Sequence, residues 1–178
     1  MRILDVGCGT GGSRIYEHAD VVGIDIDPER VAVAQKKHPS ATFYAMSAEQ
    51  MSSLPDNEFD EVVSNVALPY MNIPLALAEM HRVLKPGGAV HLTLHNPGFT
   101  LKELRRSFPR PKPTAFRLFV LANGLWFHLT GRVLRIASRS ESFQTIRGIR
   151  KALERAGFAG LEFPPAKQFV VRAIKPVK

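Results

Sequence analysis

The sequence opens with a short apolar strand that runs directly into glycines. Apolar residues surround Asp5, and the run "VGCGTGG" follows at once. A buried strand that breaks into a glycine loop lets the backbone lie against a ligand, because no side chains stand in the way. The loop fits the dinucleotide pattern G-x-G-x-x-G as well as the shorter G-x-G-x-G, so on its own it leaves NAD open as the cofactor. This start favours a cofactor-binding α/β fold.

Apolar, β-branched runs alternate with amphipathic stretches through the first half of the chain. Strands are predicted at residues 2–6, 21–25, 41–45, 59–65 and 89–95, and helices at residues 28–37 and 73–84. Pro28 suits the first turn of a helix, and "KPGG" ends the second helix. Such alternation predicts a Rossmann-like, mostly parallel sheet with helices on both faces.

The last part of the chain predicts a helix and two more strands. A helical pattern runs from about residue 142 to 156, and the runs "AGFAGLEF" and "KQFVVRAIK" are extended and separated by two prolines. They indicate a terminal antiparallel strand pair.

We expect one domain, residues 1–178, in three parts. These are a cofactor-binding half at 1–96, an insertion at 97–140 directly after the fifth strand, and the final helix and strand pair at 141–178. The first helix, within residues 12–19, is short, and little chain precedes the first strand, so we expect a fold truncated at its N-terminus. A cover for the ligand then comes from the insertion, from a second subunit, or from a segment that this sequence lacks. The oligomeric state is not indicated.

Charge divides the chain into two unlike halves. Residues 1–96 hold 7 Lys/Arg against 12 Asp/Glu, a net charge of −5, whereas residues 97–178 hold 17 against 4, a net charge of +13. A basic second half favours an anionic substrate, nucleic acid or an anionic membrane surface, and does not choose among them. A well-solvated basic surface is the structural alternative.

Other features bound the location of the protein. The single cysteine, Cys8, rules out an internal disulfide, and no signal sequence precedes the first strand, so a cytoplasmic location is expected. The apolar run at 118–129 has twelve residues, too few to span a bilayer, yet residues 101–136 can contact a membrane surface. No spacing of His, Cys, Asp and Glu indicates a metal site.

Four motifs in succession resemble those of class I methyltransferases that use S-adenosylmethionine (SAM), in the group that includes quinone-biosynthesis enzymes. The motifs are "ILDVGCGTG", "VVGIDID", "FYAMSAEQMSSLPDNEFDEVVSNVAL" and "EMHRVLKPGGAVHLTL", within residues 2–95. The resemblance implies SAM rather than NAD as the cofactor. It also implies in-line transfer of a methyl group to a small acceptor, lipophilic or anionic.

The resemblance assigns roles at the cofactor. Asp5 would accept hydrogen bonds from the cationic methionine end, and Asp25 would accept from both ribose hydroxyls. Ser47 stands where the family commonly has an Asp for the adenine amino group. The expected cofactor-binding residues are Asp5, Gly7, Cys8, Gly9, Asp25, Ile26, Ser47, Ala48 and Asn65.

The acceptor should lie beyond the carboxyl ends of the strands. His95, expected at the tip of the fifth strand, is the candidate general base, and a histidine satisfied by backbone groups is the alternative. Tyr70 and Asn96 are expected to contact the substrate. The insertion is expected to form a lid, with Trp126 as a substrate contact, and plugging of the domain core is its structural alternative. The side chains expected to face the crevice are Phe116, Phe119, Leu125, Trp126 and Phe127.

Two other functions remain open. An RNA methyltransferase is favoured by the basic second half, although the sequence has no known RNA-binding module. A catalytically silent SAM-binding or scaffold protein is favoured by Ser47, the short first helix and the missing N-terminal cover.

Overall fold

The structure is a computed structural model and describes residues 1–17, 20–95, 97–136, 139–166 and 168–177. Its strands are β1 (Arg2–Val6), β2 (Asp20–Asp25), β3 (Thr42–Ala45), β4 (Phe59–Asn65), β5 (Leu84–Leu94), β6 (Ala159–Glu162) and β7 (Phe169–Ile174). Its helices are α1 (Pro28–Lys37), α2 (Ile73–Val83), α3 (Pro97–Ser107), α4 (Pro111–Thr130) and α5 (Ile146–Arg155), with 3₁₀ turns η1 (Arg14–Glu17) and η2 (Leu68–Tyr70).

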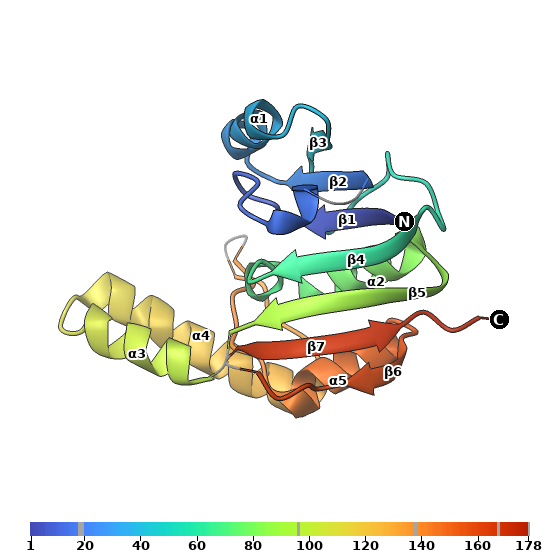
Figure 1. Cartoon of the computed structure of the whole chain (residues 1–178). Helices are drawn as coiled ribbons and strands as arrows, with labels where there is room; N and C mark the ends of the chain where they lie inside the picture. Colours follow the sequence, from blue (N-terminus) through green and yellow to red (C-terminus); the bar gives the residue numbers. More distant parts are fainter. Residues whose placement is uncertain (18–19, 96, 137–138, 167, 178) are drawn as a thin grey trace.

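The seven strands form one sheet in the order β3-β2-β1-β4-β5-β7-β6 (Figure 1). Strands β1 to β5 pair in parallel, whereas β7 runs antiparallel to both β5 and β6. The mostly parallel, Rossmann-like sheet with an antiparallel terminal pair is therefore confirmed. Parallel strands place their carboxyl ends at one edge, which is the edge where ligands bind in such sheets.

Apolar side chains alternate between two cores, one on each face of the sheet. On one face, Leu4 and Val62 pack with α2 and α5. On the other face, Ile3 and Val21 pack with η1 and α1. This alternation follows from the period of two in a strand, and it explains why helices lie on both faces.

Helix α1 begins where the sequence predicts it, because two signals coincide. The Asp27 side chain accepts hydrogen bonds from the backbone N–H of Glu29 (3.0 Å) and Arg30 (3.4 Å), and Pro28 occupies the first turn. This cap fixes the start of α1 directly after the carboxyl end of β2, and so brings Arg30 to the ligand edge.

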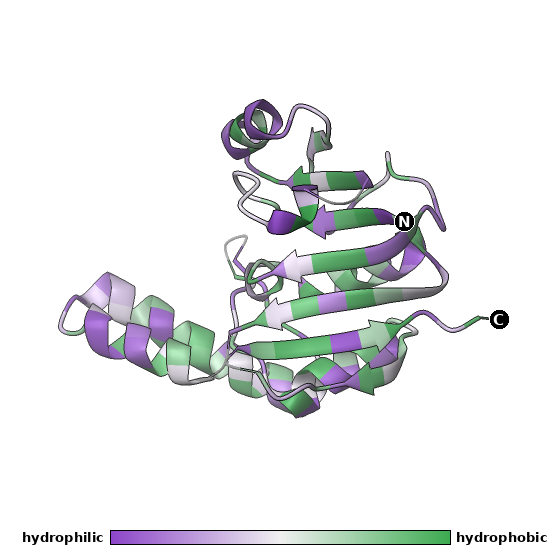
Figure 2. Ribbon diagram, in the orientation of Figure 1, coloured by the Kyte–Doolittle hydropathy of each residue, from purple (hydrophilic) through white to green (hydrophobic). Residues whose placement is uncertain are grey.

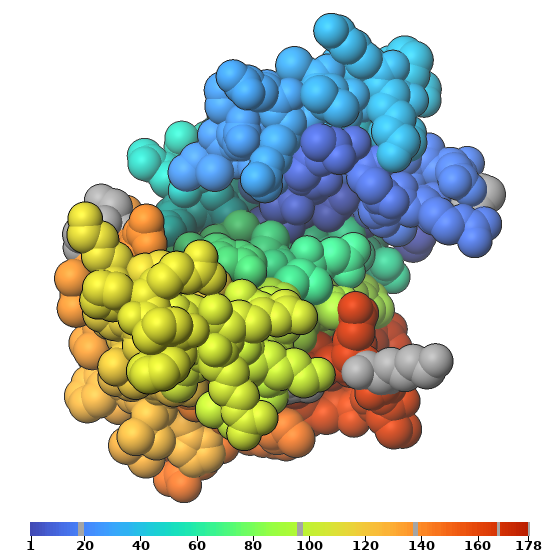
Figure 3. Space-filling view, turned by 90° about the vertical axis from the view of Figure 1, so that its left-hand side faces the viewer, coloured from blue at the N-terminus to red at the C-terminus, as the bar shows by residue number. Residues whose placement is uncertain are grey.

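The insertion is a helical hairpin, α3 and α4, that projects from the carboxyl edge of the sheet (Figure 1). Viewed toward that edge, it forms the yellow part of the surface, below the blue N-terminal part (Figure 3). Prolines lie in the first turn of α4 and do not break the helix, because the N–H groups of the first turn need no partner within the helix. Within the described part of the chain, no helix is both long and apolar enough to cross a membrane.

None of the five α4 side chains expected to face the crevice lines the pocket at the ligand edge, and at Phe127 the expectation is wrong outright. Phe127 is fully buried in the core beside α5, against Ile149 and Leu153, and therefore does not face a crevice. Gly124 lets Phe143 approach, since a Cβ there would lie 2.2 Å from the Phe143 ring. The base of α4 is thus anchored in the core, whereas Leu125 and Trp126 are exposed.

Candidate functional site

A pocket of about 340 Å³ lies at the carboxyl edge of the sheet. Four segments line it: the glycine loop, the junction of β2 and α1, the loop after β3, and the loop after β4. The lining residues are Gly7, Gly9, Ile24, Asp25, Ile26, Arg30, Met46, Ser47, Ala48, Glu49, Asn65, Val66, Ala67, Tyr70 and Met71. The size suits a small-molecule cofactor.

Contact between two loops forms one wall of the pocket. Gly7 has a φ of 75°, and a Cβ there would lie 2.2 Å from the Cβ of Ala67. Val66 has a φ of 58°, a strained conformation for a β-branched residue, and its N–H donates to the Thr93 carbonyl over 2.9 Å. Strained backbone of this kind persists only where the surrounding structure holds it in place, and it is found mostly at functional sites. At Gly9, by contrast, a Cβ would meet no atom within 4 Å, so its backbone is open to a ligand.

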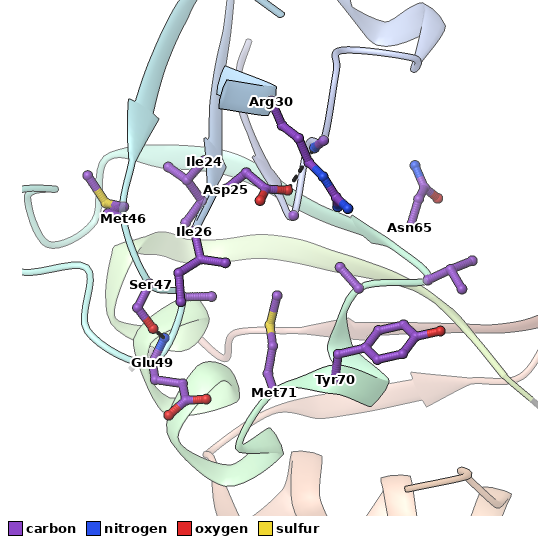
Figure 4. Close-up of a pocket in the computed structure, with 15 residues that line it drawn as sticks. Ile24, Asp25, Ile26, Arg30, Met46, Ser47, Glu49, Asn65, Tyr70 and Met71 are labelled. Atoms are coloured by element: carbon purple, nitrogen blue, oxygen red, sulfur yellow. Dashed lines mark hydrogen bonds between the residues drawn. The ribbon is translucent and has the colours of Figure 1, made fainter. Parts of the chain in front are cut away.

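Asp25 links the glycine loop to the end of β2. Its carboxylate accepts hydrogen bonds from the N–H of Gly9 over 2.9 Å and of Asp27 over 3.0 Å. Figure 4 shows this carboxylate inside the pocket, beside Arg30. Asp25 is nearly buried and not an exposed strand tip, so it holds the loop as well as facing the ligand space.

Asp5 lies beneath the glycine loop and is not among the residues that line the pocket. The Tyr16 hydroxyl donates to its carboxylate over 2.7 Å. The pKa of Asp5 is raised to about 6, chiefly by burial and to a smaller degree by the charge of Asp25, against the lowering effect of the Tyr16 hydrogen bond. A buried carboxylate with one neutral donor leaves acceptor capacity for a cation that reaches the loop.

Cys8 is a buried free thiol in the same loop. Burial, together with the charges of Asp5 and Asp25, raises the pKa of Cys8 to about 12. The thiol therefore stays protonated at neutral pH and is no nucleophile. Cys8 is not among the residues that line the pocket, and its N–H donates to the Ile24 carbonyl over 3.0 Å.

The loop after β3 carries Ser47, whose hydroxyl accepts from the Glu49 N–H over 3.2 Å. Glu49 in turn accepts from the Asn72 N–H over 2.9 Å and pairs with Arg135 at 3.2 Å. Arg135 belongs to the predicted insertion, so the end of that segment contacts the wall of the pocket. No spacing in the sequence indicates this pair, because 86 positions separate the two residues.

Three aromatic rings, of Tyr70, His95 and Phe99, gather at the end of the pocket opposite Asp25. The Tyr70 hydroxyl and His95 Nε2 lie 3.1 Å apart, and the Phe99 ring stacks on His95 with centroids 4.0 Å apart. Burial lowers the pKa of His95, so the imidazole is neutral at pH 7. Burial also raises the pKa of Tyr70, which keeps its hydroxyl protonated.

The expected site residues divide by position. Tyr70 lines the pocket, whereas His95 lies behind it, in contact with Tyr70. Trp126 is not among the lining residues, and Asn96 lies outside the described part of the chain. Of the expected cofactor residues, Gly7, Gly9, Asp25, Ile26, Ser47, Ala48 and Asn65 line the pocket.

Sequence reasoning missed several lining residues, among them Arg30, Met46, Glu49 and Met71. Arg30 lies in the first turn of a well-predicted helix, directly after the ligand edge, and that place was a usable signal. Glu49 lies two residues after Ser47. Figure 4 shows Met71 and Tyr70 on the side of the pocket opposite Asp25.

Replacing Ser47 by Asp is expected to leave SAM affinity equal or to increase it a few-fold. An Asp side chain can still accept from the Glu49 N–H, as Ser47 does, and it adds an anionic acceptor for the adenine amino group. Titration calorimetry measures the change, with Ser52→Asp on the exposed loop nearby as the control. A large loss of affinity only at position 47 would show that adenine lies elsewhere.

Comparison with known proteins agrees with this geometry. A family model described as "Methyltransferase domain" matches residues 4–92. The demethylmenaquinone methyltransferase of Chlorobaculum parvum is 30% identical in an alignment 177 positions long, which covers 92% of this chain and 68% of that protein. The 2-phytyl-1,4-naphtoquinone methyltransferase of Synechocystis is 41% identical over 115 residues, which cover 56% of this chain and 48% of that protein.

The fold has counterparts among solved structures. A SAM-dependent methyltransferase from Methanosarcina mazei superposes with a TM-score of 0.68 at 22% identity, over 99% of this chain and 93% of that one. At this identity the likeness speaks for the fold, and the family match speaks for the chemistry. The chain thus belongs to the methyltransferase domain family and is a class I SAM-dependent methyltransferase.

Proposed function

We propose that the pocket binds SAM and that the methyl group passes in line to a small acceptor, lipophilic or anionic, on the side of Tyr70 and His95. One observation carries the proposal: a single pocket has Asp25 and the open Gly9 backbone on one side and Tyr70 on the other. A carboxylate suits ribose hydroxyls, and a bare backbone lets a bulky cofactor approach. The buried Asp5 carboxylate suits the cationic amino group.

Within this proposal the protein accelerates the reaction by holding the cofactor and the acceptor in line and by excluding water from the site. SAM supplies a methyl group activated on a sulfonium. Asp5, Asp25 and the glycine loop hold and orient the cofactor, while Tyr70 and Met71 form the opposite wall. Alignment of the reacting atoms in a dry site supplies most of the rate enhancement in a displacement of this kind.

His95 is proposed as the base that takes a proton from the acceptor. Its pKa lies below the ordinary value because the ring is partly buried, so it is ready to accept a proton at pH 7. The contact with the Tyr70 hydroxyl and the stacked Phe99 ring fix the imidazole plane. A fixed, neutral imidazole at the ligand edge is suited to general base catalysis.

Replacing His95 by Gln is expected to lower kcat about tenfold while the Kd for SAM stays unchanged, since alignment still supplies most of the rate. The wild-type rate should fall as the pH drops through the lowered pKa of His95, and the variant should lack that limb. His91→Gln, on β5 just before His95, is the control. An unchanged pH profile in H95Q would leave His95 with a structural role.

The acceptor class is proposed from the relatives. Two of them are named for naphthoquinone-type acceptors, which are planar and lipophilic, and the Tyr70 ring, which lines the pocket with His95 and Phe99 behind it, suits a flat ring. The cytoplasmic location stays a prediction from the sequence.

Calorimetry with SAM, followed by turnover of radiolabelled SAM, tests the proposal. The acceptor panel contains demethylated naphthoquinones with and without a prenyl tail, short carboxylic acids and RNA. Methylation of a quinone or an acid supports the proposal, and methylation of RNA alone supports the RNA alternative, which the basic half of the chain favours. SAM binding without turnover supports a silent SAM-binding protein, and absence of SAM binding contradicts the proposal.

A further inference from the structure

One face of α4 exposes an apolar stripe along most of its length. The exposed residues recur at helical spacing and lie on one side of the helix: Ala115, Leu118, Ala122, Leu125, Trp126 and Leu129. The stripe extends about 21 Å from end to end, at a rise of 1.5 Å per residue. Leu118 is 53% exposed, Leu125 58% and Trp126 44%, which is unusual for large apolar side chains at regular spacing on one helix.

The far end of the hairpin is basic around an exposed aromatic ring. Phe108, between α3 and α4, is 74% exposed. Arg105, Arg106, Arg110 and Lys112 flank it in the sequence, and residues 97–136 hold eight Lys/Arg against one Glu. Figure 2 shows purple, hydrophilic residues toward this end and green, hydrophobic residues along α4 toward the sheet.

The opposite face of α4 is firmly held, so the stripe is not an opened core. The Asn123 side chain is fully buried and bonds the backbone of Leu134 in both directions, over 2.7 and 3.1 Å. Arg117 pairs with Glu141 at 2.9 Å and with Glu103 at 3.5 Å, which ties α4 to α3 and to the following chain. The polar side chains on the inner side of the hairpin therefore have hydrogen-bond and ion-pair partners, and the apolar stripe lies on the outer side.

We propose that the α3–α4 hairpin docks on the surface of a bilayer that contains anionic phospholipid. An amphipathic helix with a basic flank lies in the interface with its apolar side chains among the acyl chains and its cations at the headgroups. Trp126 belongs to the stripe, and tryptophan is a residue type enriched at the membrane interface. The charge excess of the segment selects anionic over zwitterionic lipid.

The docking surface adjoins the catalytic edge. Phe99 lies in the first turn of α3 and stacks on His95, so the root of the hairpin contacts the acceptor side of the pocket. A lipophilic acceptor dissolved in the bilayer would then reach the pocket along the hairpin. The docking itself does not depend on the proposed reaction, because the test below uses neither SAM nor an acceptor.

Cosedimentation with vesicles tests the docking, with phosphatidylcholine vesicles compared with a mixture of phosphatidylcholine and phosphatidylglycerol. The full chain should bind the mixed vesicles at least tenfold more tightly, with binding that weakens as salt rises. The fluorescence of Trp126, the single tryptophan, should shift to the blue on binding. Equal or absent binding to the two vesicle types would overturn the proposal.

Matched variants separate the two parts of the surface. Leu118→Gln/Leu125→Gln should lower binding to mixed vesicles about tenfold or more, and Arg105→Gln/Lys112→Gln should lower it to a similar degree and reduce its salt dependence. Val33→Gln/Leu75→Gln, at exposed apolar positions on α1 and α2, is the control and should bind as wild type. Circular dichroism and thermal unfolding establish that each variant folds.

Two other occupants of the stripe would appear in the same experiments. A second copy of the chain is indicated if sedimentation velocity shows a dimer that L118Q/L125Q dissociates while vesicles are not bound. RNA is indicated if single-stranded RNA binds and vesicles do not. Either result, or an equal loss of vesicle binding in the control variant, overturns docking on a bilayer.

Discussion

Substitution of Asp25 by Ala is expected to weaken SAM binding about a hundredfold, because it would remove the two charge-assisted hydrogen bonds proposed between this carboxylate and the ribose. The geometry adds a second contribution. The same carboxylate accepts from the backbone N–H of Gly9 and of Asp27, so its loss also frees the glycine loop. The effect should therefore exceed that of losing ligand contacts alone.

Two further variants separate these contributions. Asp25→Asn keeps one acceptor oxygen for the loop and loses the charge, so its affinity should lie between those of wild type and Asp25→Ala. Asp20→Ala, at the other end of β2 where the side chain is exposed, is the matched control and should bind SAM as wild type. Calorimetry gives the affinities, and thermal unfolding shows whether the proteins are folded. A folded Asp25→Ala protein with unchanged affinity would refute the assignment of the ribose site.

The parts of the fold that the sequence predicts are those fixed by local signals. The bounds of α1 are correct because Asp27 and Pro28 mark its start and the cap geometry follows from those two residue types. The parallel strands are found for a similar reason, since buried strands are continuous apolar runs. β5 begins earlier than predicted, at Leu84, because the "KPGG" segment that ends α2 also carries a register shift in the pairing with β4.

The insertion shows where local signals mislead. Its prolines and the pair Asn123-Gly124 suggest that a helix would be interrupted there, yet α4 continues through the pair. Tertiary contacts decide both positions: Asn123 bonds the backbone of the chain that follows α4, and Gly124 makes room for Phe143. Such partners lie 11 to 19 positions away in the chain, so neither periodicity nor propensity indicates them.

The residues of the candidate site also fall into two groups, those that local motifs indicate and those that depend on contacts between distant parts of the chain. The glycine loop, Asp25 and Ser47 follow directly from motifs at the ends of strands. The strained backbone of Val66 and the pair of Glu49 with Arg135 depend on how separate loops meet. The Tyr16 hydroxyl on Asp5 belongs to this second group, and it lowers the pKa of that carboxyl against the larger effect of burial.

Asp5→Asn is expected to stabilise the free protein while it weakens SAM binding. The folded pKa of about 6 lies above the ordinary value of 3.8, so the folded state holds its proton more tightly than the unfolded state. Asp5 therefore leaves the free energy of unfolding unchanged below about pH 4, where it is protonated in both states. As the pH rises from 4 to 6 the free energy of unfolding falls, and at pH 7 it is lower by about 3 kcal/mol at most. An Asn has no charge to bury, so the free energy of unfolding at pH 7 should rise by about 2 kcal/mol.

The same substitution should lower SAM affinity roughly thirtyfold at pH 7, because the cationic amino group loses its anionic partner. The wild-type affinity should also fall as the pH drops through 6, where Asp5 becomes protonated, whereas the variant should show no such dependence. Denaturant unfolding at pH 4 and pH 7 and calorimetry across the same range measure both effects.

Tyr16→Phe is the matched control: it removes a donor to the carboxylate, so it should raise the pKa of Asp5 and move the fall in affinity to higher pH without abolishing it. Loss of stability in Asp5→Asn at pH 7, or a pH dependence of binding that survives in it, would mean that this carboxylate is a structural partner of Tyr16 and not the group that receives the cofactor.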